Sequence, residues 1–428
     1  MRRTPLLVPA VLLIVGIAIG KPLVDRHDPT RWEAACNGQV YLALQLAETP
    51  QPRAKSFQAK ARVERVDGRR AHGDITLYLK RDSAAAQLRY GDRLLLHGYP
   101  DTLQRSIYIT SDHYLVTARD STSLRARAEG LRLHLLHRMQ QGPLDPRHAG
   151  IAEALVLGWR GDLEPSVRAA FRDSGILHLL CVSGLHVGLV AAMVGGLLFW
   201  MGKERKWCIV RGAVQLVAVW GFVLTSGLAP SSVRAALMFS LLIVSRSLAR
   251  RTDSLNLLAA TAIVMLCARP SLLFDLGWQL SFSAVGGILM AQPVLRSFRF
   301  KLTQSLTAST AATLGSLPII LATFHRLPLY FLVANLAIAP YTTLLMLLAL
   351  AYAALPCPFT ASLLGPLLRL TDWLTAWIAS IPYAVIEPIE FAPLPLALLT
   401  VAVVAVLLGP WLIIGMQNRY DTQYLAEQ

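Results

Sequence analysis

Apolar residues follow two different patterns along this chain and divide it into two parts. Between residues 36 and 118, apolar and polar residues alternate in short runs, and turn-forming steps such as Asp67-Gly68 and Gly91-Asp92 separate the runs. Alternation with period two between such breaks predicts β-strands joined by turns. From residue 177 onward, long apolar runs follow one another closely, and this pattern predicts helices that cross a membrane.

The predicted crossings number nine or ten. A run at residues 1–20 follows Arg2 and Arg3, and we expect a retained anchor there rather than a cleaved signal. A run at 361–383 is amphipathic and bounded by proline, so it either crosses or lies in the interface. The other predicted spans lie at about 177–200, 207–228, 232–249, 254–268, 272–292, 303–323, 329–355 and 394–415.

The predicted fold class is a polytopic α-helical membrane protein with an N-terminal extracytoplasmic all-β domain. For the β domain, a generic all-β fold and an OB-like barrel both fit the strand spacing. Residues 122–141 predict a basic amphipathic helix with Leu124, Leu131, Leu135 and Leu136 near one apolar face, and residues 148–173 predict two helices split at Gly161-Asp162. The predicted organisation is an anchor at 1–20, an OB-like β domain at 36–118, amphipathic and linker helices at 122–176, a multi-span domain at 177–415 and a tail at 416–428.

Composition supports an integral membrane protein. Of 428 residues, 54% are hydrophobic and only 16% are charged. The net charge of +15 does not by itself indicate a nucleic-acid partner, because Lys and Arg collect on the cytoplasmic side of membrane proteins. Residues 21–177 hold 24 Lys and Arg against 18 Asp and Glu, a modest excess that is compatible with a polyanion-binding surface.

Basic residues alternate between the predicted loops and set the orientation. Every second loop is rich in them, and the loops between hold single arginines (Arg234, Arg269 and Arg326) near the membrane. The positive-inside rule then places the N-terminus in the cytoplasm and the β domain outside. The predicted inside loops carry the run KERK at 203–206, then Arg246, Arg250 and Arg251, and then Arg296, Arg299 and Lys301.

The five cysteines predict neither a disulfide framework nor a metal site. Cys36 alone belongs to the β domain, so no disulfide can form within it, and the other four lie in or beside apolar spans. No paired spacing typical of zinc ligands occurs, and we expect no metal and no cofactor.

One predicted span is unusually polar. Residues 174–199 read SGILHLLCVSGLHVGLVAAMVGGLLF and include His178, Ser183 and His186. Ionisable groups near the centre of a membrane helix cost roughly 2.5–3.5 kcal/mol each, so they usually face a cavity or a partner. Three readings remain open: the wall of a polar path, helix packing with hydrogen-bonded histidines, and an intramembrane hydrolase in which His186 activates Ser183.

Four further polar residues lie within the membrane layout. Asp275 and Gln279 are four apart and share a helical face, and Asn335 lies inside the run YFLVANLAIAP. Arg234 near a span end either snorkels to the interface or pairs with Asp275 across helices. If Asp275 does not pair, we expect it to cap a helix.

These segments resemble the ComEC family of competence proteins, the inner-membrane DNA-uptake channels. GILHLLCVSGLHVGLV is similar to the hallmark segment of that family, and ALVLGWRGDLEPSVRAAFRDSG is similar to the stretch that precedes it. SGLAPSSVRAALMFS, RPSLLFDLGWQLSFSAVG and FHRLPLYFLVANLAIAP are similar to three later blocks. Residues 36–118 are similar, more weakly, to the N-terminal OB-like domain of the family.

The resemblance implies a channel, not an enzyme, that moves single-stranded DNA across the bacterial inner (cytoplasmic) membrane into the cytoplasm. Membrane lipid surrounds the multi-pass domain, and a homodimer and a monomer both remain open. Two alternatives of other classes are a small-solute or lipid-linked transporter and the intramembrane Ser/His hydrolase. The positions that the resemblance assigns to the channel lining or gate are His178, Ser183, Gly184, His186, Arg234, Asp275, Gln279 and Asn335.

Two partners are expected from what this sequence lacks. Longer members of the family continue into a metallo-β-lactamase-like domain, proposed to degrade the strand that is not transported. This sequence contains no H-x-H-x-D-H run and no phosphate-binding loop. We therefore expect a separate nuclease and a separate cytoplasmic DNA-translocating motor.

Overall fold

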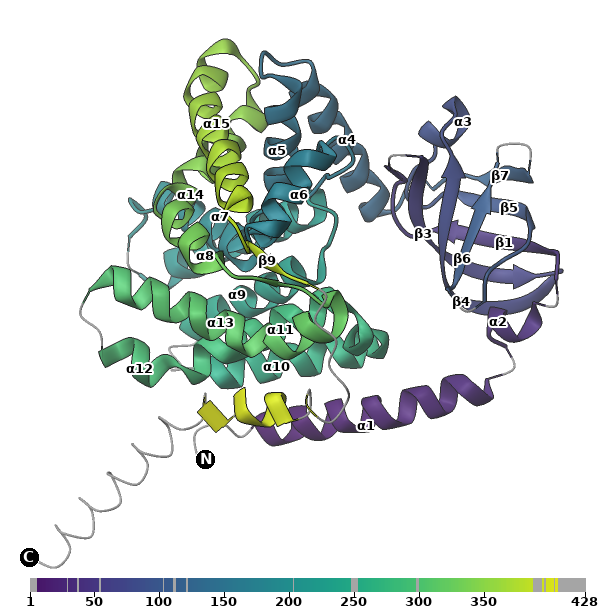
Figure 1. Ribbon diagram of the computed structural model, residues 1–428, viewed down its shortest axis with the longest axis horizontal. Coiled ribbons are helices and arrows are strands. Elements are labelled where there is room, and N and C mark those ends of the chain that lie inside the picture. The colour runs from purple at the N-terminus through teal and green to yellow at the C-terminus, as the bar shows by residue number, and fades with distance from the viewer. Residues whose placement is uncertain are drawn as a thin grey trace, which may run out of the picture.

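A helical body and a smaller β domain make up the protein, and helix α1 (Leu7–His27) runs along the base of both (Figure 1). The computed structural model describes residues 6–406 except 29, 37, 54, 103, 111–112, 121, 203, 248–252, 298–299, 388–394, 396–397 and 404. Arg2, Arg3, most of the predicted span at 394–415 and the predicted tail at 416–428 lie outside the described residues.

The predicted all-β domain is present. A curved sheet runs in the order β6-β4-β3-β1-β5-β7, and β2 pairs with β3. All its pairings are antiparallel except that of β4 with β6, which is parallel. The strands are β1 (Val40–Leu46), β2 (Gln51–Pro52), β3 (Ser56–Val66), β4 (Arg69–Lys80), β5 (Arg93–Gly98), β6 (Ser106–Ile109) and β7 (Tyr114–Ala118).

Alternating residues of these strands form the core of the β domain. Leu42, Leu44 and Leu46 of β1 are buried, and the residues between them face outward. Trp32, from the short helix α2 (Trp32–Ala35), is fully buried against the sheet. Gly73 makes room for it: its φ is +136°, and a Cβ there would lie 2.6 Å from the Trp32 ring. The period-two pattern therefore predicted this core correctly, whereas an OB-like barrel remains a prediction.

The linker region folds into three helices: α4 (Leu124–Gln140), α5 (Pro146–Leu157) and α6 (Pro165–Asp173). The predicted split at Gly161-Asp162 is confirmed. The predicted apolar face of α4 is confirmed in its second half, where Leu136 is buried and Leu135 half-buried, and wrong in its first half, where Leu124 and Leu131 are exposed. The helix also buries Glu129 and Arg132, which pair at 3.3 Å. Arg132 also donates through Nε to the Leu157 carbonyl at 2.9 Å, so its charge is compensated inside the body.

The remaining helices largely follow the predicted apolar runs. Shorter elements connect them: α3 (Ser83–Ala86) in the β domain, α12 (Gln292–Ser297), the 3₁₀ turn η3 (Pro270–Phe274), and the pair β8 (Leu327–Pro328) and β9 (Val385–Ile386). The long helices of the body are α7 (Gly184–Leu197), α8 (Arg205–Thr225), α9 (Pro230–Ser247), α10 (Ser254–Ala268), α11 (Leu276–Met290), α13 (Lys301–Phe324), α14 (Phe331–Ala354) and α15 (Pro358–Ser380).

By length and composition, two described helices are long and apolar enough to cross a bilayer. They contain Lys206–Thr225 and Leu306–Phe324, and a third candidate is the bent pair Phe331–Ile338 and Pro340–Ala354, whose halves meet at 59°. Pro340 lies at that bend, where it removes a backbone donor and breaks the helical ladder. Shorter apolar helices follow most of the other predicted spans. The body is thus compatible with a membrane protein, and the predicted nine or ten crossings remain a prediction.

The predicted span at about 177–200 is not one continuous helix. The chain forms a 3₁₀ turn, η2 (Leu177–Leu180), then an extended stretch, and α7 begins only at Gly184. Ser183 has the extended backbone of a helix N-cap, with φ −114° and ψ 174°. The Ser-Gly-Leu-His run therefore lies at a helix N-terminus instead of in the middle of a span.

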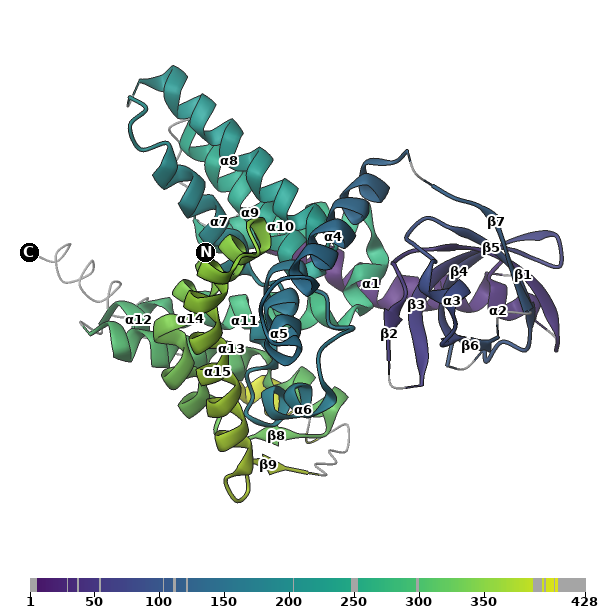
Figure 2. The ribbon, with the colours of Figure 1, turned by 90° about the horizontal axis from the view of Figure 1, so that it is seen from above.

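Helices α11 and α13 lie side by side at unusually short range. A Cβ on Gly315 would lie 2.5 Å from the Ser283 carbonyl oxygen and 3.2 Å from the Cα of Gly287. Glycines at a crossing allow such close approach of two backbones, as is common in membrane helices. Seen from above, α7, α8 and α9 extend away from this pair on one side of the body (Figure 2).

Candidate functional site

The start of α7 holds Ser183 and His186 in direct contact. Nδ1 of His186 accepts a hydrogen bond from the Ser183 backbone N–H at 3.1 Å and lies 2.8 Å from Ser183 Oγ. A backbone N–H can only donate, so Nδ1 is unprotonated and the Ser183 hydroxyl donates to it. The neutral imidazole then carries its proton on Nε2.

The Nε2 atom of His186 is a buried donor without an acceptor among the described residues. His186 is only 1% exposed. A buried N–H without a hydrogen-bond acceptor costs about 1–3 kcal/mol of stability, and a ligand that accepts a hydrogen bond from it would remove that cost. An anionic oxygen is the natural acceptor for such a donor.

Arg234 on α9 lies beside this N-terminus. It is 6% exposed, its Nε donates to Ser281 Oγ at 2.8 Å, and the guanidinium lies 5.8 Å from the centroid of the Phe282 ring. A Cβ on Gly184 would be 3.5 Å from its Nη2 atom, so Gly184 leaves room for the cation at the first turn of α7. No acidic side chain among the described residues acts on Arg234. A buried cation without a counterion is costly, which indicates an anion-binding role.

Three helix N-termini meet around these side chains. Ser231 Oγ, at the start of α9, donates to the Val182 carbonyl at 2.8 Å, and this bond joins the starts of α7 and α9. Gly277, at the start of α11, lies against Pro230 at the start of α9: a Cβ placed on Gly277 would lie 3.8 Å from Cγ of Pro230. Each helix N-terminus presents free N–H groups and a partial positive charge, and such ends bind anions.

Asp275 and Gln279 serve the start of α11. Asp275 Oδ1 accepts from the Trp278 backbone N–H at 3.0 Å, which confirms the expected capping role. Gln279 Nε2 donates to the Leu273 carbonyl at 2.8 Å and closes the η3 turn. The alternative pairing of Asp275 with Arg234 is not found among the described ion pairs.

The other predicted positions do not join this group through any contact found in the described residues. His178 lies in η2, and its electrostatic effect reaches His186. Asn335 lies on α14, which packs against α4, α5, α13 and α15. Trp278, near the start of α11, is 5% exposed and stacks on Phe282 with ring centroids 4.2 Å apart.

Sequence reasoning missed two side chains that complete the site. Ser281 anchors Arg234, and its position two residues after Gln279 gave no periodic signal. Arg160 donates through Nη2 to Cys181 Sγ at 2.7 Å and through Nε to the Leu180 carbonyl at 3.3 Å. Arg160 therefore holds the extended stretch that leads into Ser183. The Trp-Arg-Gly-Asp run at 159–162, charged between two apolar segments, was the available signal.

Ser183 and His186 also have part of the geometry of a hydrolase. The Ser183 hydroxyl lies at hydrogen-bonding distance from a histidine base. However, Nδ1 is shared with a backbone N–H, and no described residue orients the ring through Nε2. The described residues include no group of three His, Cys, Asp or Glu side chains placed to hold a metal ion.

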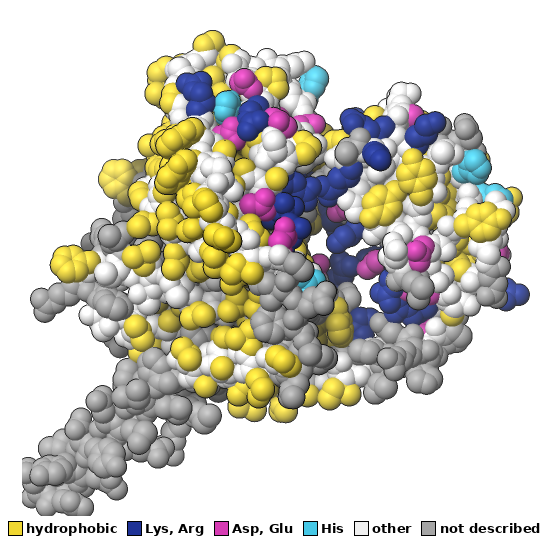
Figure 3. Space-filling model, in the orientation of Figure 1, with side chains coloured by type: hydrophobic (Ala, Val, Ile, Leu, Met, Phe, Trp, Pro, Cys, Tyr) yellow, Lys and Arg dark blue, Asp and Glu magenta, His cyan; other side chains and the backbone are white. Residues whose placement is uncertain are grey.

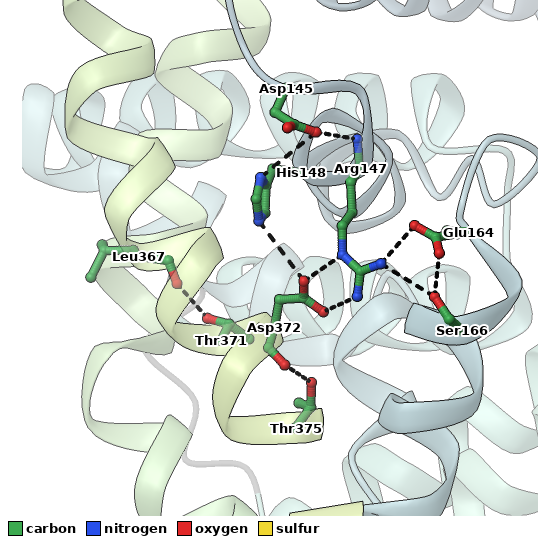
Figure 4. Close-up of polar contacts among 9 residues, drawn as sticks. All are labelled: Asp145, Arg147, His148, Glu164, Ser166, Leu367, Thr371, Asp372 and Thr375. Atoms are coloured by element: carbon green, nitrogen blue, oxygen red, sulfur yellow. Dashed lines mark hydrogen bonds and ion pairs between the residues drawn. The ribbon is translucent and has the colours of Figure 1, made fainter. Parts of the chain in front are cut away.

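A polar cluster fixes α15 to the helices before the site. Figure 4 shows Arg147 of α5 between Asp372 of α15 and Glu164, just before α6. Its Nε and Nη2 donate to the two oxygens of Asp372 at 2.6 and 3.1 Å, and its Nη1 donates to Glu164 at 2.7 Å. His148 lies 3.9 Å from Asp372. A two-point contact of this kind fixes geometry as well as distance.

Glu153 is a buried acid behind the site. It is 1% exposed on α5, and its Oε2 atom has no hydrogen-bond partner among the described residues. Burial raises the pKa of the Glu153 carboxyl to about 8, and the charge of Asp162 adds to the effect. The residue is therefore protonated at neutral pH, which removes the cost of a buried charge.

Comparison with known proteins identifies related chains. The sequence profile of the family described as Competence protein matches residues 155–414. ComE operon protein 3 of Bacillus subtilis is 28% identical over 325 residues, which cover 72% of this chain and 41% of the relative. Competence protein ComA of Neisseria gonorrhoeae is 27% identical over 276 residues, which cover 61% of this chain and 38% of the relative. The chain thus spans less than half the length of these two relatives. No solved structure matches significantly.

Proposed function

The chain belongs to the Competence protein family, and on that premise we propose that it is a channel that passes single-stranded DNA into the cytoplasm during DNA uptake. The observation that carries the proposal is Arg234, a buried cation without an acidic partner among the described residues. It lies beside Gly184 at the start of α7, two residues before His186, whose buried Nε2 donor has no acceptor among the described residues.

The chemistry of a DNA strand fits this site. Each phosphate carries a negative charge and two oxygens that accept hydrogen bonds. Crossing a bilayer, it needs donors that replace the water it leaves behind. A guanidinium, an imidazole N–H and the ends of three helices are donors of that kind. A small-solute or lipid-linked transporter has less need of a buried cation left without a counterion.

The location we propose is the bacterial inner membrane, with several crossings and the OB-like β domain on the periplasmic side. The support is the alternation of basic loops in the sequence and the apolar helices of the body. We further propose that a cytoplasmic motor pulls the strand and that a separate nuclease degrades its complement. Lipid surrounds the body, and the chain acts as a monomer or a homodimer.

An uptake assay on Arg234→Met tests the function. The variant replaces the wild type in a transformable host that lacks its own family member, and entry of labelled DNA into a nuclease-resistant pool is measured. Losing a charge-assisted contact worth about 2–3 kcal/mol predicts a loss of roughly 30-fold or more. The matched control is Arg211→Met on α8, a half-buried arginine outside the site, which should retain uptake.

One outcome would count against the proposal, and a second variant separates it from the hydrolase alternative. Normal uptake by a stably inserted Arg234→Met protein would remove the assigned role of this cation. Ser183→Ala in the same assay separates the hydrolase alternative, because a nucleophile cannot be dispensed with. Full uptake by that variant is the expected result for a channel.

A further inference from the structure

Four arginines gather where the β domain meets the helical body. Arg53 follows β2, Arg160 follows α5, and Arg168 and Arg172 belong to α6. Partial burial lowers the pKa of the Arg168 guanidinium, and the positive charges of Arg53, Arg160 and Arg172 lower it further. The backbones also meet here, since a Cβ on Gly161 would lie 2.5 Å from the Pro52 ring. Figure 3 shows Lys and Arg side chains lining the recess between the two parts.

The four positive charges are compensated only in part. Arg172 pairs with Asp173 at 2.7 Å, and Arg53 donates to the neutral Gln58 amide at 2.9 Å. Arg160 spends two donors on Leu180 and Cys181. No described carboxylate pairs with Arg160 or lowers the repulsion at Arg168. Like charges held together at partial burial oppose one another, so this cluster is set up for an anionic partner.

Two exposed contacts join the β domain to the body. Arg125 of α4 donates to the Ala47 carbonyl of the β domain at 3.0 Å and lies 4.4 Å from the centroid of the Tyr90 ring. Arg269 pairs with Asp74 of β4 at 3.3 Å. Through these contacts the arginines of the β domain and of the body lie on two sides of one recess.

The cluster is continuous with the candidate site. Arg160 contacts Leu180 and Cys181, and Ser183 follows two residues later. A strand held at the recess is therefore close to the stretch that leads to Ser183, His186 and Arg234. The arginines of the cluster come from the β2–β3 turn, the α5–α6 connection and α6, so they lie outside the Ser-Gly-Leu-His run of the candidate site.

We propose that Arg53, Arg160 and Arg168 form a phosphate-binding site that receives single-stranded DNA between the β domain and the helical body and directs it to the start of α7. This inference rests on the proposed function. It adds to that function a docking site outside the membrane helices, built from the β domain and the helical body.

Binding of a fluorescent single-stranded oligothymidine to the purified full-length protein in nanodiscs tests the site. The variant is Arg160→Gln with Arg168→Gln, and the matched control is Arg69→Gln with Arg70→Gln, two exposed arginines at the β3–β4 turn. We expect binding at least about tenfold weaker for the first, and a salt slope lower by about 1.4, because two phosphate contacts to a single strand are lost. The control should bind like the wild type. Arg160→Lys with Arg168→Lys, which keeps both charges, should recover most of the binding and shows that folding is intact.

Each other outcome has a definite meaning. If the wild type does not bind the oligonucleotide, the proposed function fails and the docking site fails with it. If the wild type binds and both glutamine variants bind equally well, or lose equally, the docking site is overturned while the proposed function stands. Loss of binding to phosphatidylglycerol vesicles, with oligonucleotide binding unchanged, would likewise overturn it in favour of a lipid headgroup site.

Discussion

His186 shows how a local backbone choice sets the chemistry of a side chain. Its Nδ1 is occupied by the backbone N–H and the hydroxyl of Ser183, so only Nε2 is left for a ligand. A histidine in mid-helix would present either nitrogen. Because Ser183 caps the helix through Nδ1 of His186, the imidazole can offer only its Nε2–H, as a hydrogen-bond donor, to a ligand.

The buried carboxyl of Glu153 makes the stability of the protein depend on pH. Its pKa of about 8 in the folded protein lies above the usual value of 4.5, so the folded state keeps a proton that the unfolded chain releases. Stability therefore falls as pH rises from about 4.5 to about 8, by about 1.4 kcal/mol per pH unit from this group, and levels off above. Glu153→Gln should flatten the pH dependence of Tm, measured in detergent between pH 5 and pH 9.

The control for that measurement is Glu164→Gln, since Glu164 is exposed and hydrogen bonds lower its pKa. That variant should keep the falling branch between pH 5 and pH 8. A Glu153→Gln protein with the same slope as the wild type would show that Glu153 is ionised in the folded state.

At the scale of elements, α15 depends on Arg147. One face of this helix is buried against α5, α6 and α14, and Asp372 in that face has its charge met by Arg147 (Figure 4). The opposite face is apolar and exposed, with Trp373 and Trp377 stacked 6.2 Å apart. Such a face fits a lipid surface, in keeping with the interfacial preference of tryptophan.

Asp372→Asn should destabilise the packing of α15. The change keeps the volume of the side chain and leaves the Arg147 guanidinium without its two-point partner. We expect the free energy of unfolding to fall by about 1–3 kcal/mol, measured by thermal unfolding in detergent. Glu164→Gln removes the other, exposed contact of Arg147 and should cost less than about 1 kcal/mol. Equal losses of stability in the two variants would show that the two-point contact between Arg147 and Asp372 does not hold α15.

Elements could be predicted from the sequence where one pattern decided them. The strands of the β domain follow the period-two alternation, and the hairpin turn falls at Asp67-Gly68, where both residues have positive φ. The start of α7 was missed because apolar content outweighed a local signal: Ser183 with a side chain three residues later that bonds back to it is a helix start. For α4, the buried residues include the paired Glu129 and Arg132 besides Leu136 and Met139, and hydrophobic periodicity does not predict the burial of a charged pair that forms only on folding.

The candidate site was predictable only in part, because some of its contacts form only when separate elements pack together. The sequence pointed to Ser183, Gly184, His186 and Arg234, and these meet in the structure. Asp275 and Gln279 were assigned to the same lining, which stays a prediction; in the structure Asp275 caps α11 and Gln279 closes the η3 turn. Arg160 and Ser281 come from other elements, and only the packing of those elements brings them to the site.

At the scale of the whole molecule, the orientation of the chain decides what the recess and the site can do. If the basic loops face the cytoplasm, the β domain and its arginine cluster face outward, and a strand meets the recess before the start of α7. The reverse orientation would place the recess at the exit. The proposed direction of transport therefore depends on topology.

Cysteine labelling tests that orientation. In a variant without the five native cysteines, Glu204→Cys should resist an impermeant maleimide applied to intact cells, because its loop is predicted to be cytoplasmic. Arg70→Cys in the β domain should react. Labelling at residue 204 in intact cells, with residue 70 protected, would reverse the layout.

Photo-crosslinking detects a DNA strand as it passes the start of α7. A DNA strand with a bulky protein on its trailing end is arrested during uptake, in cells whose channel carries a photoreactive residue at Ser231, beside Val182, or at Val217, exposed on α8. We expect the arrested strand to crosslink at position 231 and not at position 217. Continued entry of DNA with no crosslink at position 231 would show that the strand takes another path.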